Sequence, residues 1–64
     1  MDEPAKIAVS RTGYTTHYPA KLMAGQIGFE VRDPKGNYMS GHNTRQSAKD
    51  SIKIYEAADS RRSK

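Results

Sequence analysis

The feature that most constrains the fold is a β-hairpin signal in the middle of the chain. Apolar residues occupy every second position of residues 26–32, namely Ile27, Phe29 and Val31. Such alternation indicates a strand with one buried and one wet face, as in antiparallel sheets. Residues 33–36, Asp-Pro-Lys-Gly, are the types preferred in a type I turn. The sequence therefore predicts that residues 37–40 return as the next antiparallel strand.

Weaker signals precede this hairpin. Residues 6–10 alternate in the same way and predict a short strand. Residues 14–18 combine aromatic and β-branched residues, which predicts either a second strand or an extended loop. Residues 19–25 begin with proline and end with glycine, a pattern typical of a helix of one or two turns.

A C-terminal helix completes the predicted fold. It would begin after Asn43 or Thr44 and run to about Asp59, and with Asn43 as the cap Gln46 would complete a capping box. The helix would pack on one face of a sheet of three or four strands, in a single α+β domain spanning 1–64 with flexible ends at about 1–5 and 60–64. The predicted core consists of Ile7, Val9, Ile27, Phe29, Val31, Ala48, Ile52, Tyr55 and one of Tyr38 or Met39.

Composition limits the chemistry. Leu, Ile, Val and Phe supply only 8 of 64 residues, so the core must be thin. A thin core has little room for a ligand cavity, so we expect no enzyme and no small-molecule substrate. With no cysteine and two distant histidines, expected in exposed loops, no metal or other cofactor is predicted. No apolar run could span a membrane and the acidic start is unlike a signal peptide, which predicts a cytoplasmic protein with no membrane partner.

Basic and aromatic residues are predicted on the outer face of the sheet. The net charge of +4 and pI near 9.6 allow binding to a polyanion. Gly28 would leave that face open to a partner backbone, or mark a bulge. The candidate binding residues on this face and at its edges are Lys6, Arg11, Tyr14, Tyr18, Arg32, Lys35 and Tyr38. Alternatively, the tyrosines complete a core that is short of Leu and Phe.

A second basic surface is predicted on the helix, on the side opposite its apolar stripe. Lysine and arginine recur there at i, i+4 spacing, and further bases follow the helix end. This surface could track a phosphate backbone, or it could be a solvated helix face with local ion pairs. Its members are Arg45, Lys49 and Lys53, followed by Arg61, Arg62 and Lys64.

The stretch from Phe29 to Gly36, with Gly41 and with Thr44 four residues before Ala48, carries a family resemblance. Over about residues 28–54 the chain resembles the second half of the DNA-binding domain of plant ethylene-response factors. Its layout is similar to the arm-binding domain of some tyrosine recombinases. The resemblance implies a three-stranded sheet that enters the DNA major groove, with Arg32 as the best-matched contact and Lys35 as a phosphate contact.

Two functions are therefore predicted. One is a non-enzymatic module that binds nucleic acid through the outer face of its sheet. The other is a stand-alone phage- or plasmid-type inhibitor or adaptor that binds a host protein, such as a defence nuclease complex, by analogy of fold alone.

Overall fold

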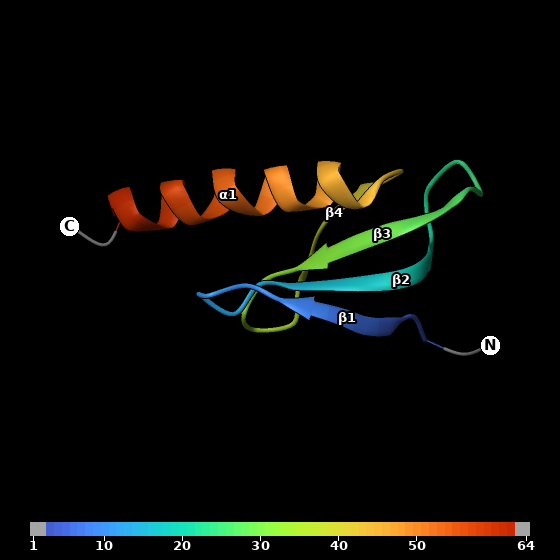
Figure 1. Cartoon of the computed structure of the whole chain (residues 1–64), viewed down its shortest axis with the longest axis horizontal. Coiled ribbons are helices and arrows are strands. Elements are labelled where there is room, and N and C mark those ends of the chain that lie inside the picture. The colour runs from blue at the N-terminus through green and yellow to red at the C-terminus, as the bar shows by residue number, and fades with distance from the viewer. Residues whose placement is uncertain (1–2, 63–64) are drawn as a thin grey trace.

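The computed structural model describes residues 3–62 as a four-stranded antiparallel sheet followed by one helix. Strands β1 (Ala5–Val9), β2 (Thr15–Lys21), β3 (Ile27–Arg32) and β4 (Tyr38–His42) lie in chain order, and helix α1 (Arg45–Arg62) covers one face of the sheet (Figure 1). This confirms the predicted α+β fold. We call the face under α1 the helix face and the opposite one the outer face. Because α1 packs mainly on β3 and β4, it leaves β1 less covered.

All three hairpin turns close in the same way. In each, the backbone N–H of a glycine donates to the carbonyl three residues earlier, over 2.9 to 3.1 Å. Each of these glycines has a positive φ, which a side chain would oppose. They are Gly13 (φ 102°), Gly25 (φ 82°) and Gly36 (φ 92°). The predicted turn at residues 33–36 is thereby confirmed.

The short helix predicted at residues 19–25 is wrong. Strand β2 continues to Lys21, through a cis peptide bond between Tyr18 and Pro19, and a turn from Leu22 to Gly25 leads into β3. Glycine at positive φ terminates helices and closes hairpins alike, so it could not distinguish the two. Proline is tolerated here because the register of β2 against β3 is irregular between His17 and Ala20. Most of residues 14–18 therefore belong to a strand rather than to a loop.

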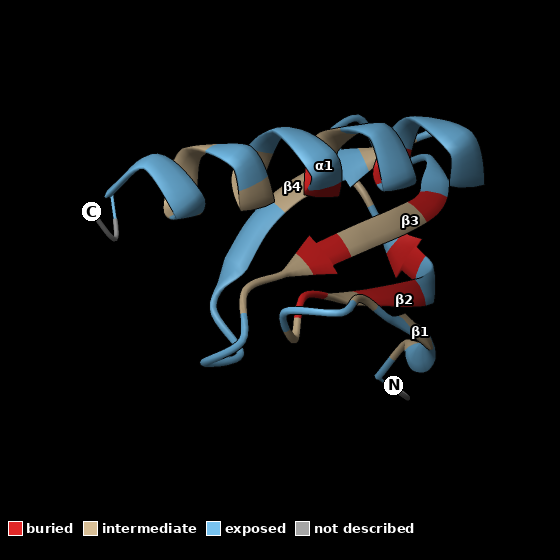
Figure 2. Ribbon diagram, turned by 60° about the vertical axis from the view of Figure 1, so that its left-hand side comes forward, coloured by how far each residue is buried: buried red, intermediate tan, exposed pale blue. Residues whose placement is uncertain are grey.

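Buried residues, red in Figure 2, lie on β2, β3 and α1, and the core is a small cluster of them between α1 and the sheet. Val31 and Ala48 are fully buried, and Ile52 and Tyr14 are nearly so. Phe29 and Tyr55 pack against this cluster. The rings of Tyr14 and Tyr55 stack with their centroids 5.7 Å apart. Five predicted core positions are confirmed as part of this packing, namely Phe29, Val31, Ala48, Ile52 and Tyr55.

Other predicted core positions are wrong, because their side chains are exposed by at least 37 %: Ile7, Val9, Ile27 and both Tyr38 and Met39. A β-bulge between Lys6 and Ala8 reverses the alternation of β1. Ala8 therefore lies opposite the buried Thr16 on the helix face. A second irregularity near Met39 places Ser40, rather than Tyr38 or Met39, opposite Val31.

The helix begins after Thr44, whose hydroxyl accepts the Ser47 N–H at 3.1 Å. Thr44 is thus the cap, and Gln46 donates to Asp50 instead of completing a capping box on Asn43. Helix α1 continues to Arg62, past the predicted end at about Asp59. At the other end β1 already includes Ala5. Residues 1–2 and 63–64, with Lys64, lie outside the described residues.

Substituting Gly28 tests the closest backbone approach in the sheet. A Cβ atom at this position would overlap the carbonyl oxygen of His42 and the side chain of Leu22. Because a backbone oxygen cannot move aside, Gly28→Ala should lower the free energy of unfolding by about 1–3 kcal/mol in denaturant melts. Gly41→Ala is the control and should cost less, since its nearest neighbour is a mobile methyl of Leu22 at 2.8 Å. A Gly28→Ala midpoint equal to that of the parent would contradict this packing.

Candidate nucleic-acid interface

Three of the predicted binding residues come together on the outer face. Lys6 lies on β1, Arg32 ends β3, and Lys35 lies in the turn between β3 and β4. They share a shallow hollow of about 290 Å³, which we call the basic groove. Its other lining residues are Gly13, Thr15, His17, Asp33, Pro34 and Gly36. The strand register produces this grouping, because β2 places Thr15 opposite Arg32 and His17 opposite Lys6.

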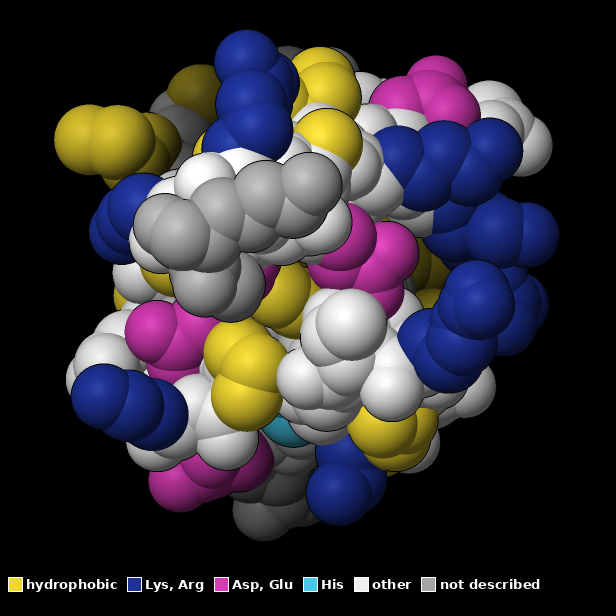
Figure 3. Space-filling model, turned by 90° about the vertical axis from the view of Figure 1, so that its left-hand side faces the viewer, with side chains coloured by type: hydrophobic (Ala, Val, Ile, Leu, Met, Phe, Trp, Pro, Cys, Tyr) yellow, Lys and Arg dark blue, Asp and Glu magenta, His cyan; other side chains and the backbone are white. Residues whose placement is uncertain are grey.

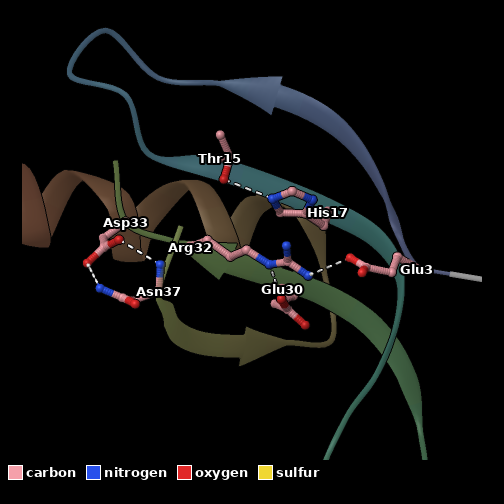
Figure 4. A network of polar contacts seen from close by, with 7 residues as sticks. All are labelled: Glu3, Thr15, His17, Glu30, Arg32, Asp33 and Asn37. Atoms are coloured by element: carbon pink, nitrogen blue, oxygen red, sulfur yellow. Dashed lines mark hydrogen bonds and ion pairs between the residues drawn. The ribbon is translucent and has the colours of Figure 1, made fainter. Parts of the chain in front are cut away.

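Arg32 is already held by two carboxylates (Figure 4). Its Nε donates to Glu30, and its Nη2 lies 3.9 Å from a carboxylate oxygen of Glu3. The side chains of Arg32 and Glu30 are only 26 % and 17 % exposed, whereas that of Glu3 is 85 % exposed. The Arg32–Glu30 pair is therefore the fixed part of this network, and Glu3 is the part that a ligand could displace. The alternation predicted Glu30 on this face but not its pairing with Arg32.

His17 lies in the basic groove, which corrects its predicted place in an exposed loop. Its Nε2 lies 2.8 Å from the hydroxyl of Thr15. Burial lowers the pKa of His17, and the nearby charge of Arg32 lowers it further. The imidazole is therefore neutral at pH 7, and the cations of the groove are Lys6, Arg32 and Lys35. The spacing of two residues between Thr15 and His17, which puts both side chains on one face of a strand, was the signal that could have located it.

A second hollow, of about 480 Å³, lies on the outer face and is bordered by Glu30. We call it the Tyr38 pocket, and it is lined by Lys21, Leu22, Met23, Gly25, Glu30 and Tyr38. Leu22 folds over Gly28 and Gly41, and a Cβ on Gly41 would lie 2.8 Å from Leu22 Cδ2 and 3.2 Å from Tyr38 Oη. The space above Gly28, where a side chain is missing, is thus filled by Leu22 and by the backbone of β4. Leu22 was missed as a site residue because residues 19–25 were expected to form a short helix.

The other predicted members of the outer-face site lie elsewhere. Tyr14 is 4 % exposed and belongs to the core, so its assignment to a binding face is wrong. Tyr18 stacks on Phe29 with ring centroids 4.5 Å apart, and Phe29 packs toward α1, so Tyr18 lies on the helix face. Arg11 is exposed in the turn between β1 and β2, where hydrogen bonds from Thr12 and Ser10 lower the pKa of Glu56 and the charge of Arg11 lowers it further. The structure therefore separates these three residues from the basic groove.

The basic row of the helix is also placed differently from the prediction. Lys49 and Lys53 are not opposite the apolar stripe, because they line a hollow of about 220 Å³ together with Ile52, Ala8 and Val9. This hollow runs between α1 and β1, and Glu56 also lines it. Figure 3 faces the end of the molecule where α1 finishes, and shows acidic side chains among the Lys and Arg side chains there. Arg45 is exposed at the first turn of the helix.

Two further features bear on chemistry. Within residues 3–62, no three His, Cys, Asp or Glu side chains are grouped so that they could hold a metal ion. In the same part of the chain, no helix combines the length and the apolar character needed to cross a membrane.

Comparison with known proteins adds no relative, because no protein-family model, curated protein or solved structure matches the chain. The resemblance to ethylene-response factors and recombinase arm-binding domains therefore stays a prediction.

Tyr14 gives the fold a testable dependence on alkaline pH. Its hydroxyl donates to the Asp59 carboxylate at 2.5 Å, and this hydrogen bond, with burial, raises the pKa of Tyr14 to about 12. The unfolded chain releases the same proton near pH ~10. The stabilisation is therefore complete below that pH and is lost as pH rises toward about 12.

The measurement compares the free energies of unfolding of the parent and Tyr14→Phe from about pH 8 upward. The advantage of the parent should shrink as pH rises toward the pKa of Tyr14, which lies at about 12. A difference that stays constant over the whole range would show that the hydroxyl makes no such bond.

Proposed function

We propose that this chain is a small non-enzymatic, cytoplasmic protein that binds nucleic acid through the outer face of its sheet. The observation that carries the proposal is the grouping of Lys6 and Lys35 with the exposed ring of Tyr38 on one face. The register places Tyr38 directly opposite Arg32, which lines the same groove as both lysines. Lysines attract phosphates and aromatic rings stack on bases, so this combination suits a nucleic acid.

The ion pairs within the basic groove determine which of its cations would contact a phosphate first. Lys6 and Lys35 are exposed, and neither has an ion pair within the described part of the chain. Arg32, by contrast, is paired with Glu30 and Glu3. The lysines are therefore the first phosphate contacts, and Arg32 becomes more accessible to phosphate when Glu3 moves away. The net charge of +4 adds a general attraction to the polyanion.

The experiment is a salt titration of binding to a labelled oligonucleotide. Each phosphate that a lysine neutralises contributes about 0.7 to the slope of log K against log salt for a single strand, and about 0.9 for a duplex. Lys6→Gln and Lys35→Gln should each lower the slope by about that amount. Because both side chains are exposed, their removal should change stability by no more than ~0.5 kcal/mol.

The matched control is Lys49→Gln, which removes the same charge from helix α1. Screening acts over about 10 Å at ~0.1 M salt, so this variant should change the slope much less. Equal small effects of Lys35→Gln and Lys49→Gln would show attraction by net charge alone and would contradict a binding site on the outer face.

A second candidate function is favoured by the exposed apolar side chains away from the groove. Val9 is 62 % exposed on an edge strand, and Ile54 is 68 % exposed on α1. Unpaired strand edges and exposed apolar groups are features of surfaces that bind proteins. The chain would then act as the inhibitor or adaptor, of phage or plasmid type, that binds a host protein. Absence of nucleic-acid binding by the parent at ~50 mM salt would favour this function.

A further inference from the structure

The Tyr38 pocket and the basic groove meet at one ion pair. Glu30 lines the pocket, Arg32 lines the groove, and the two side chains are bonded to each other. A chain molecule lying across the outer face would therefore pass directly from one hollow to the other. The alternation of cation and aromatic ring along that path matches the alternation of phosphate and base in a polynucleotide.

The pocket offers a base two apolar surfaces. Tyr38 is 59 % exposed and Met23 is fully exposed, although this chain has few large apolar side chains to spare. Leu22 lies over Gly28 and Gly41 and forms the floor between them. An unstacked base that enters the pocket would remove these surfaces from water and lie against the Tyr38 ring.

Of the hydrogen-bonding side chains that line the pocket, those of Lys21 and Tyr38 are exposed and that of Glu30 is partly buried. The Glu30 carboxylate only accepts hydrogen bonds, and its Oε2 already accepts one from Arg32. Its side chain is 17 % exposed, so a base would reach it in a partly dehydrated setting. An exocyclic amino group, such as N4 of cytosine, can donate to it, whereas the O4 of uracil would meet a second acceptor.

From this placement we infer that the ligand of the outer face is a single strand, with one unpaired base in the Tyr38 pocket, and that Glu30 selects a base bearing an exocyclic amino group. The inference rests on the proposed function and names its substrate class. A duplex cannot supply such a base without unpairing it, because its ring faces are stacked and its pairing edge is occupied. The strand would continue from this base into the basic groove, where its phosphates would lie toward Lys6 and Lys35.

The test compares three labelled probes at ~50 mM salt: oligo(dC), oligo(dU) of the same length, and a mixed-sequence duplex. The parent should bind oligo(dC) about tenfold more tightly than oligo(dU). Glu30→Gln keeps an acceptor for Arg32 and adds a donor, so it should bind the two strands equally. Tyr38→Leu should weaken binding to oligo(dC) by about tenfold or more, through the loss of stacking.

The control is Ile54→Ala, which shortens an apolar side chain of similar exposure on the helix. It should leave all three affinities unchanged, and thermal melts should show that every variant is folded. Equal binding of oligo(dC) and oligo(dU) by the parent would overturn the role of Glu30. Tighter binding to the duplex, unaffected by Tyr38→Leu, would overturn the single-strand inference and leave the proposed function standing. No binding to any probe would overturn both.

Discussion

The packing of Val31 against α1 is the contact on which the rest of the fold depends. Val31 is the largest side chain among the described residues that is completely removed from water, and Ala48 and Ile52 close over it. So small an apolar cluster contributes little by itself, since burial stabilises by only ~25 cal/mol for each Å². Hydrogen-bonded tyrosines supply what aliphatic residues usually would. Tyr14 donates to Asp59, and Tyr55 donates to Ser40 at 2.7 Å, so the buried ring of Tyr14 and the partly buried ring of Tyr55 both have their hydroxyls satisfied.

The parts of the fold that the sequence predicts correctly are those with local causes. The strand around Phe29 and Val31 alternates without interruption, and the turn at residues 33–36 has the right residue at each position. The predictions that failed depend on pairing between distant residues, or on a residue type that fits two different structures. A bulge in β1 depends on pairing with β2, and it moved Ile7 and Val9 out of the core. Gly25 at positive φ closes a hairpin here, although the same residue could have ended a helix.

The candidate site likewise has one part that the sequence predicts and another part that it does not. Alternation was enough to predict that Lys6 and Arg32 share the outer face with Glu30, because each belongs to an exposed side of a strand. Their convergence with Lys35 follows from a predictable turn. The Tyr38 pocket could not be predicted, because it needs Leu22 to fold back over two glycines that are 13 residues apart in sequence. A mid-strand glycine signals a close approach, but it does not identify the group that approaches.

The Arg32–Glu30 pair explains how a nearly balanced surface could still favour an anionic ligand. In and beside the basic groove the charges of Lys6, Arg32 and Lys35 are offset by those of Glu3, Glu30 and Asp33. Asp33 accepts three hydrogen bonds within its own turn, from the backbone of Lys35 and from the backbone and side chain of Asn37, which lower the pKa of its carboxyl group. Glu3, the most exposed of the acids, is also the most weakly held at 3.9 Å. A phosphate that displaces Glu3 would gain Arg32 without breaking its bond to Glu30. The same pair would then hold the phosphate contact and the base-reading carboxylate in a fixed relation, which is what alternating contacts along a single strand require.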